Sequence, residues 1–221
     1  MHTEIFYTCS DKLKCDVRNA AAIYFIYLTM IKAEAIDKTT VINVLSSSFE
    51  DNQSVNFIVS QDEKRARRIQ ALMDSSYEIC SLFGEVWLSD DKNACALILY
   101  PHQKRTTLKS IWLDIRLIVQ AIGLSGISNA LKREAKIKHL QPKEEMTYLW
   151  FIGVDPDFQH RDIGNKLLKE IIIHSNQKKL PVYLETSTLR NIPWYESHGF
   201  HTYNQLELGY TLFFLKRKPD K

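Results

Sequence analysis

The spacing of apolar positions changes several times along the chain, and each change marks a new structural element. Residues 38–50 and 62–83 place apolar side chains three or four positions apart, which predicts two amphipathic helices. Asp37 precedes the first helix and is expected to cap its N-terminus. Gly84 follows the second helix and is expected to end it.

Shorter apolar runs predict strands. Residues 30–35 form the first of these runs, and residues 85–89 and 94–100 form two more. Because the turn-forming residues 90–93 separate the last two, we expect a β-hairpin there. Residues 148–154 are almost continuously apolar, which is typical of a central strand that is buried on both faces.

Helical and strand-like segments also alternate in the C-terminal half. Residues 106–140 predict two helices that are separated near Gly123–Gly126, and residues 164–179 predict one amphipathic helix. A strand is expected over residues 181–186, followed by a short helix over residues 191–198.

The end of the chain predicts one more strand. Gly199 follows the short helix in the position of a Schellman cap, residues 206–215 are strand-like, and residues 216–221 form a charged tail. No linker divides residues 30–221. The pattern therefore predicts one three-layer domain of the α/β or α+β class with a mixed sheet.

The polar loop between residues 154 and 165 is the segment most informative about function. It joins the apolar strand to a helix that begins near Gly164, and main-chain N–H groups at a helix N-terminus have no intrahelical acceptors. The helix dipole places partial positive charge at the same end, and Arg161 adds a full charge. The segment therefore predicts an anion site that suits a pyrophosphate.

Composition narrows the function classes. The chain has 221 residues, 45% of them hydrophobic, with a net charge of +3, and it carries no compact stripe of basic and aromatic residues of the kind that binds nucleic acid. Its four cysteines show no C-x-x-C pair and no zinc-ligand spacing with histidines. We therefore expect a cytoplasmic protein with neither a metal site nor a nucleic-acid partner.

Residues 1–29 leave several interpretations open. The apolar run over residues 20–31 is too short for a confident membrane span, so no membrane partner is expected. A signal peptide is disfavoured by two tyrosines inside the run and by acidic residues before it. A third interpretation takes Met30 as the natural start and residues 1–29 as an N-terminal extension.

Several motifs together resemble one family. The segment Gln159-His-Arg-Asp-Ile-Gly164 is similar to the Gln/Arg-x-x-Gly-x-Gly/Ala motif of the GNAT superfamily of N-acetyltransferases. A second motif of that superfamily is matched by Leu184-Glu-Thr-Ser187, Asn191, Tyr195 and Gly199-Phe200. The resemblance covers residues 146–215 and implies a three-layer fold with a central, mostly antiparallel mixed sheet flanked by helices.

The resemblance also implies acetyl-CoA as the acetyl-donor cosubstrate. The main chain of the strand before the loop would pair with the pantetheine arm, the loop amides would hold the pyrophosphate, and one asparagine would bind near the thiol. The implied contacts are Phe151, Ile152, Gly153, Val154, Gln159, His160, Arg161, Asp162, Ile163, Gly164, Asn165 and Asn191.

Two residues take catalytic roles in the same comparison. Tyr195 matches the general acid that protonates the departing thiolate. Glu185 is our first choice for the general base that takes a proton from the acceptor. The implied reaction is direct acetyl transfer, in a ternary complex, to a primary amine of a small molecule, by a monomer or homodimer.

One position departs from the family pattern. Asp162 stands where the family has its first glycine, and a carboxylate beside a pyrophosphate is unfavourable unless it points away or pairs with Arg161 or His160. Aspartate tolerates left-handed backbone angles better than most residues. The alternative function is a degenerate GNAT domain that acts as a CoA-binding or interaction module without catalysis, and Asn191 and Tyr195 would then have only structural roles as a helix cap and a core aromatic.

Overall fold

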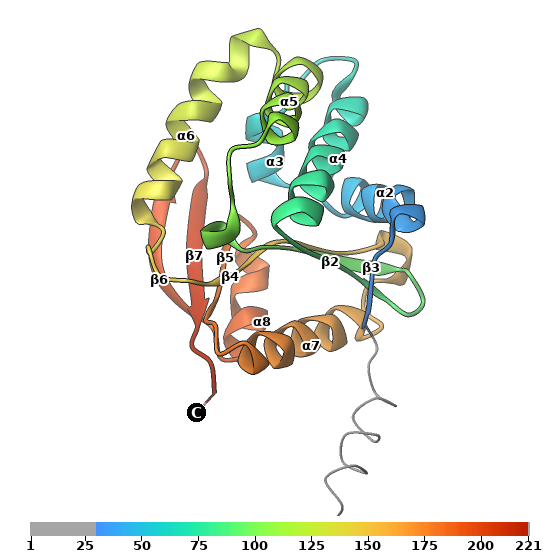
Figure 1. The fold of residues 1–221 in the computed structure, drawn as a ribbon, viewed down its shortest axis with the longest axis vertical. Helices are drawn as coiled ribbons and strands as arrows, with labels where there is room; N and C mark the ends of the chain where they lie inside the picture. Colours follow the sequence, from blue (N-terminus) through green and yellow to red (C-terminus); the bar gives the residue numbers. More distant parts are fainter. Residues whose placement is uncertain (1–29, 221) are drawn as a thin grey trace, which may run out of the picture.

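The computed structural model describes residues 30–220, so the interpretations of residues 1–29 lie outside the described part of the chain. A seven-stranded sheet forms its centre, in the order β1-β2-β3-β4-β5-β7-β6 (Figure 1). The strands are β1 (Met30–Lys32), β2 (Gly84–Ser89), β3 (Ala94–Leu99), β4 (Thr147–Val154), β5 (Val182–Thr186), β6 (His201–Glu207) and β7 (Thr211–Arg217).

Helices lie on both sides of this sheet. The α-helices are α2 (Lys38–Ser48), α3 (Gln53–Ile58), α4 (Arg65–Phe83), α5 (Leu108–Leu117), α6 (Ile127–Leu140), α7 (Ile163–Gln177) and α8 (Ile192–Ser197). A π-helical segment, η3 (Ile118–Ile122), continues α5. The short 3-10 segments are η1 (Ala35–Asp37), η2 (Pro101–Gln103), η4 (Leu124–Gly126), η5 (Pro156–Phe158) and η6 (Leu189–Asn191).

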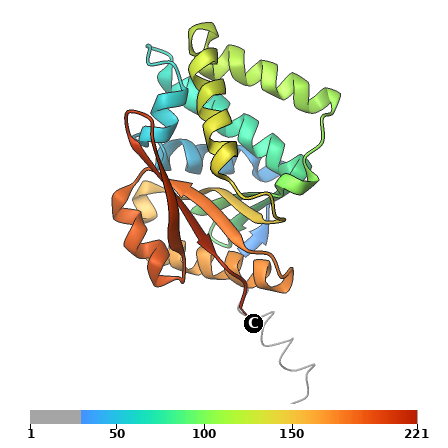
Figure 2. The same cartoon turned by 90° about the vertical axis from the view of Figure 1, so that its left-hand side faces the viewer.

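The sheet separates two main apolar cores. α7 and α8 cover one face, while α2 and α4 cover the other (Figure 1). A third, smaller core lies where α6 packs over β7 (Figure 2). Among the described strands, only β4 and β5 run parallel, and the other five neighbouring pairs are antiparallel. The predicted three-layer fold with a mixed, mostly antiparallel sheet is therefore confirmed.

Most of the predicted elements form where their patterns placed them. The hairpin of β2 and β3 is present, and β4 is covered on both faces by helices. The break between α5 and α6 falls at Gly123, whose φ of 74° lies in the region that glycine adopts without strain. Among residues 30–220, no single helix is long and apolar enough to cross a membrane, although 108–122 and 124–140 meet the length and composition criteria as a pair bent by 104°.

The predicted cap of α2 is wrong. Asp37 stands in the N-cap position, but its side chain accepts no capping hydrogen bond from the helix. Its carboxylate instead accepts from Lys92 Nζ at 2.7 Å and from the main-chain N–H of Glu34 at 3.0 Å. These hydrogen bonds hold the pKa of Asp37 below its ordinary value, and they tie the start of α2 to the β2–β3 turn.

The predicted end of α4 at Gly84 is confirmed, because the helix runs from Arg65 to Phe83, but Gly84 ends it without a left-handed cap. Its backbone angles, φ −169° and ψ −138°, are extended, so it is not a left-handed cap at the end of α4. Gly84 is the first residue of β2, and a Cβ atom there would lie 2.0 Å from the main-chain oxygen of Ile98. The glycine is required because the helix passes directly into a strand that lies against the main chain of β3.

The C-terminal strand was predicted incompletely. Residues 201–217 form a hairpin of two strands, β6 and β7, instead of one strand over 206–215 and a charged tail. Gly209, with a φ of 85°, lies in the turn between them. The Schellman cap at Gly199 is confirmed, because the N–H of Gly199 donates to Glu196 O at 2.9 Å and the N–H of Phe200 donates to Tyr195 O at 3.2 Å.

Candidate functional site

The two parallel strands at the centre of the sheet separate. β4 and β5 pair only at Thr147 with Val182 and at Tyr148 with Tyr183. Beyond Tyr148, the edge of β4 that faces β5 has no ladder partner in the described chain, although its other edge remains paired with β3 as far as Val154. The sheet therefore presents free main-chain donors and acceptors at its centre, where an extended ligand can pair with them.

An irregularity in β4 accompanies this separation. The register between β3 and β4 shifts so that Leu97 pairs with Phe151 and Ile98 with Leu149, which leaves Trp150 as the extra residue. As a result, Trp150 and Phe151 both pack toward the core beneath α2 and α4. The bulge thus changes which side chains the separated part of β4 presents to each face.

Close packing of α2 fixes the end of β4. A Cβ atom at Gly153 would lie 2.9 Å from Ser48 Oγ and 3.2 Å from a methyl carbon of Leu45. Ser48 Oγ donates to the main-chain oxygen of Val154 at 2.8 Å. Gly153 therefore allows α2 to approach β4, and the hydroxyl of Ser48 anchors the point at which the strand enters the loop.

The loop after β4 turns sharply into α7. His160 and Asp162 both have left-handed backbone angles, with φ of 62° and 65°. Ile163, Gly164 and Asn165 form the first turn of α7, where N–H groups have no acceptor within the helix. The predicted arrangement of loop amides and a helix N-terminus is therefore present after the central strand.

Arg161 lies along the loop on its exposed side. Its Nη2 donates to the main-chain oxygen of Asp157 at 3.1 Å, and its guanidinium lies 4.8 Å from the ring centre of Phe158. Since no carboxylate among residues 30–220 pairs with this guanidinium, the Arg161 charge remains available beside the loop amides.

Asp162 is held by Asn165, and not by Arg161 or His160. Asn165 Nδ2 donates to Asp162 Oδ1 at 2.5 Å, and Asn165 Oδ1 accepts from the indole N–H of Trp194. Trp194 belongs to α8, and its ring lies 4.6 Å from the ring of Tyr195. One asparagine therefore connects the loop to the helix that carries Tyr195.

Tyr195 lies in the core between α8 and the sheet. Its side chain is 5% exposed, and its ring contacts Trp194 and Phe200. Burial raises the pKa of the Tyr195 phenol, so the phenol stays protonated at neutral pH. Asn191 occupies the N-cap position of α8 but accepts no capping hydrogen bond, so the interpretation of Asn191 as a side-chain cap is wrong.

Glu185 lies at the C-terminal end of β5. Its carboxylate accepts from the hydroxyl of Tyr148 and from Gln141 Nε2, the latter at 2.9 Å. Burial raises the pKa of Glu185 above its ordinary value, although these two hydrogen bonds act in the opposite direction. A carboxyl group of this kind accepts a proton more readily than an exposed glutamate.

Sequence reasoning missed two features of the site and gave a third no role of its own. They are the bulge at Trp150, the connection from Asn165 to Trp194, and Ser187, whose buried hydroxyl has no hydrogen-bond partner among the described residues. Ser187 immediately follows β5, beside the point where β4 and β5 have separated. Of the three features, only Ser187 could have been found from the sequence, because it lies in the short polar stretch between β5 and Asn191.

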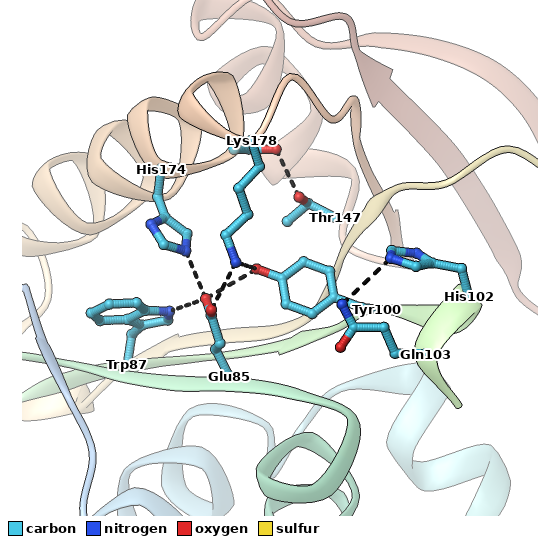
Figure 3. Close-up of polar contacts among 9 residues, drawn as sticks. Glu85, Trp87, Tyr100, His102, Gln103, Thr147, His174 and Lys178 are labelled. Carbon is cyan, nitrogen blue, oxygen red and sulfur yellow. Dashed lines mark hydrogen bonds and ion pairs between the residues drawn. The ribbon is translucent and has the colours of Figure 1, made fainter. Parts of the chain in front are cut away.

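A second polar cluster lies at the other end of the sheet. Glu85 pairs with Ile98 in the β2–β3 ladder, whereas the site lies where Ala94 pairs with Val154. Figure 3 shows that the Glu85 carboxylate receives hydrogen bonds from several surrounding side chains. The donors are Trp87 at 3.1 Å, Tyr100 at 3.0 Å, His174 at 2.7 Å and Lys178 at 2.8 Å. This cluster fastens the C-terminal end of α7 to the sheet, so that the site lies at the helix's other end.

Replacing Glu85 with glutamine is expected to lower the free energy of unfolding by about 2–3 kcal/mol at pH 7, because it removes two charge-assisted contacts. Burial would raise the pKa of Glu85, but the hydrogen bonds and charges of His174 and Lys178 outweigh burial and hold it well below 4.5. The contribution of Glu85 is therefore present above pH 4.5 and is lost as the pH falls below that value.

Urea unfolding between about pH 3 and pH 7 measures both effects. The variant should lose less stability on acidification than the wild type, because it lacks the titrating group. Glu50→Gln is the matched control, since the Glu50 side chain is 60% exposed and its carboxylate pairs with Arg65 at 3.5 Å on the surface. Equal acid sensitivity of Glu85→Gln and wild type would contradict the role of Glu85.

Comparison with known proteins agrees with this geometry. Residues 121–202 match the family model of the acetyltransferase (GNAT) domain. An uncharacterised N-acetyltransferase of Schizosaccharomyces pombe is 42% identical over 53 residues, which cover 24% of this chain and 22% of that protein. The matched segment therefore spans about a fifth of the length of this curated relative.

Solved structures share the fold at low sequence identity. A Corynebacterium glutamicum structure described as histone acetyltransferase HPA2 and related acetyltransferase has a TM-score of 0.68 and 17% identity, covering 87% of this chain and 97% of that chain. An N-acetyltransferase from Staphylococcus aureus Mu50 has a TM-score of 0.54 and 12% identity, covering 85% and 98%. These similarities concern the fold of the described domain.

Proposed function

Since the chain belongs to the GNAT superfamily of acetyltransferases, we propose that it is an N-acetyltransferase that uses acetyl-CoA and acts on a primary amine. The observation that carries the proposal is the separation of β4 from β5 beside a loop of free amides. The separated strands can pair with an extended arm that carries amide groups, such as pantetheine. The loop amides can bind a pyrophosphate.

The residues present fit acetyl-CoA in two respects. Main-chain groups of residues 151–154, on the edge that faces β5, can pair with the pantetheine arm. N–H groups from residues 160–165 can bind the pyrophosphate, with the Arg161 charge beside them, whereas the N–H of Gln159 already donates to Pro156 O at 3.4 Å. Asn191, at the start of α8, and the unsatisfied hydroxyl of Ser187 are polar groups close to the separated strands and are our candidates for the thiol end.

Bound acetyl-CoA supplies an acetyl thioester, whose carbonyl carbon is attacked by the amine and whose thiolate leaves. We assign the proton for that thiolate to the hydroxyl of Tyr195, which matches the general acid of the family and, like any phenol, carries its proton at neutral pH. Free N–H groups on the separated edge of β4 are donors that can polarise the thioester carbonyl. No cysteine lies in the motif segment to form an acyl-enzyme, which supports direct transfer in a ternary complex.

Glu185 is our candidate for the general base. Its raised pKa favours proton uptake, and its hydrogen bonds to Tyr148 and Gln141 hold the carboxylate in one orientation. A proton from the acceptor ammonium could reach it directly or through one water molecule.

One arginine joins three segments on the side of the sheet that carries Glu185. Arg133 of α6 donates to Tyr210 Oη at 3.0 Å and to Ser54 Oγ at 2.5 Å, which joins α6 to the β6–β7 turn and to α3. We propose a small-molecule primary amine as the acceptor. We also propose that the enzyme works in the cytoplasm.

The competing proposal is a CoA-binding or interaction module without catalysis, which Asp162 first suggested. The geometry weakens that argument, because Asp162 adopts the left-handed conformation that the loop needs and its carboxylate is engaged by Asn165. We therefore assign Asp162 a role in ordering the loop.

Replacing Asn165 with alanine tests this role. The variant loses the hydrogen bonds to Asp162 and Trp194, and the Asp162 carboxylate is left free beside the loop amides. We expect acetyl-CoA to bind about tenfold more weakly, which corresponds to about 1.4 kcal/mol. Titration calorimetry measures the dissociation constant. Asn176→Ala is the matched control on α7, because Asn176 contacts Asp220 at the helix's other end; equal or tighter binding by Asn165→Ala would overturn the role of Asp162.

An assay with acetyl-CoA and a panel of primary amines tests the proposed function. Release of free CoA thiol that depends on an amine, together with the acetylated amine in the mass spectrum, is the expected result. Binding of acetyl-CoA without transfer to any amine would favour the module, whereas absence of binding would reject both.

A further inference from the structure

Ser187 carries a buried hydroxyl that has no hydrogen-bond partner among residues 30–220. The residue is only 9% exposed. A polar group that loses its contact with water and gains no partner destabilises a protein, so native structures contain few such groups and each one calls for an explanation. The hydroxyl is therefore a candidate contact for a ligand.

Two other serine hydroxyls of the described chain are buried without a partner, those of Ser46 and Ser75, and both lie in helices. In a helix, a serine can rotate about χ1 and donate to the carbonyl four residues earlier, as Ser76 does to Leu72 O at 2.9 Å. Ser187 lies between β5 and η6, where it has no helical carbonyl of this kind. Of the three hydroxyls, only that of Ser187 cannot be satisfied by such a rotation.

The turn that contains Ser187 is held by its neighbours. Thr186 Oγ1 accepts from the main-chain N–H of Thr188 at 3.1 Å, which closes the turn around Ser187. Thr186 is itself 8% exposed, so the bond that closes the turn is shielded from solvent. The main chain of Ser187 is therefore held in place before any ligand binds, which makes its hydroxyl a preorganised group.

Ser187 lies level with the separated part of β4. Tyr148 pairs with Tyr183, so a residue of β4 is matched by the residue of β5 that lies 35 positions later. Carried forward along the two parallel strands, this register places Ser187 level with Ile152. Ile152 belongs to the part of β4 whose edge toward β5 has no ladder partner in the described chain. A ligand that lies between the two strands therefore passes beside Ser187.

The level of Ser187 selects one end of the proposed ligand. The pyrophosphate is assigned to the loop and to the start of α7, beyond the end of β4. The pantetheine arm is assigned to residues 151–154, so the end of the arm that is farthest from the loop lies near Phe151 and Ile152. The hydroxyl of Ser187, level with Ile152, is thus placed to meet the thioester and not the pyrophosphate.

A hydroxyl of this kind suits charge that develops during a reaction. Negative charge develops on the oxygen and the sulfur of a thioester while the amine attacks and the thiolate leaves. A donor that is already buried and unpartnered gives up no other hydrogen bond when it binds this charge. It therefore stabilises the charged state more than it stabilises the neutral thioester, which is the requirement for catalysis.

We propose that Ser187 is a further catalytic residue, whose hydroxyl donates a hydrogen bond to the thioester as negative charge develops on it. The hydroxyl keeps its proton, and no covalent bond to Ser187 forms or breaks. The thiolate still takes its proton from Tyr195. This inference rests on the proposed acetyl transfer, whereas the unpartnered hydroxyl is a property of the protein without ligand.

Urea unfolding of the protein without ligand tests the first half of the inference. Ser187→Ala removes a buried group that has no partner, so the midpoint of unfolding should equal or exceed that of the wild type. A lower midpoint would show that the hydroxyl is hydrogen-bonded before any ligand binds, and would overturn the inference without any activity assay.

Kinetics and cofactor titration test the second half. With an amine that the wild type acetylates, Ser187→Ala should lower kcat by about 10- to 100-fold, the range for one hydrogen bond to a charged group. The dissociation constant of acetyl-CoA should change by less than about threefold, because the bond strengthens only as charge develops. Ser75→Ala is the matched control, since its hydroxyl is also buried and unpartnered but lies on α4, which packs over β2 and β3; it should keep the wild-type kcat.

The outcomes separate this inference from the proposed function. A wild type that transfers acetyl groups, together with an unchanged kcat in Ser187→Ala, would overturn the role of Ser187 and leave the proposed function standing. Weaker binding of acetyl-CoA at an unchanged kcat would also overturn it, because Ser187 would then be a binding residue only. A wild type that binds no acetyl-CoA would reject the proposed function itself.

Discussion

Replacing Tyr195 with phenylalanine is expected to lower kcat by about 10²- to 10⁴-fold, the range that a positioned general acid contributes. The hydroxyl is the only group lost, and Tyr195 Oη makes no hydrogen bond to another residue of the described chain, so folding should be little affected. Acetyl-CoA affinity should stay within about threefold of the wild type, because the phenol acts on the departing thiolate and not on cofactor binding.

Steady-state kinetics with varied acetyl-CoA, together with cofactor titration, measures both quantities. Tyr77→Phe is the matched control, since Tyr77 is buried to a similar degree (6% exposed, against 5% for Tyr195) and its hydroxyl donates to Glu34 O far from the site. The control should keep the wild-type kcat. An unchanged kcat in Tyr195→Phe would remove Tyr195 as the acid.

Replacing Gly84 with alanine is expected to destabilise the fold by about 3 kcal/mol or more, which is large for a single methyl group. The added Cβ would lie 2.0 Å from the main-chain oxygen of Ile98 and 2.9 Å from its carbonyl carbon. Since these atoms belong to the β3 backbone, relief would require β2 and β3 to move apart and would disturb their ladder. Thermal or urea unfolding measures the loss.

Gly126→Ala provides the comparison for Gly84→Ala. A Cβ at Gly126 would lie 2.9 Å from Cγ2 of Ile122, one side-chain atom, whereas a Cβ at Gly84 would meet three main-chain atoms of β3. The φ of Gly126 is −84°, which alanine adopts without strain. The control should change stability by less than about 1 kcal/mol. If Gly84→Ala were as stable as Gly126→Ala, close contact between residue 84 and β3 could not be the reason that position 84 requires glycine.

The fold was largely predictable because most of its elements have one buried face. α4 and α7 show helical spacing of apolar residues, and β4 shows a continuous apolar run, so local pattern alone identifies them. β6 escapes such prediction because nearly all of its residues are exposed or half-exposed and polar, which gives a strand no periodic signal. Its position is set by pairing with β7, which no local pattern records.

Two glycines show why residue type alone is insufficient at element ends. Gly199 and Gly84 both follow helices, and the sequence correctly predicts that a helix ends before each of them. Gly199 has the left-handed φ that the cap requires, whereas Gly84 is extended and is needed for close contact with the neighbouring strand. The distinction depends on what lies beside the residue in three dimensions.

The candidate site was predictable to the extent that it is local in sequence. The loop and the start of α7 form one continuous segment, so their pattern predicts an anion site. The separation of β4 from β5 and the bulge at Trp150 depend on strand register, which is decided by partners distant in the chain. The contact between Asn165 and Trp194 likewise joins residues 29 positions apart.

The identity of the loop's ligand is the central claim. Titration calorimetry of the full chain with acetyl-CoA tests it most directly, because it requires no knowledge of the acceptor amine. We predict one molecule bound per chain with a dissociation constant of roughly 1–100 µM, within the range of substrate affinities for enzymes, and competition by free CoA. Absence of binding heat at millimolar acetyl-CoA, from protein shown to be folded, would contradict the assignment of the loop and of the separated strands to this cofactor.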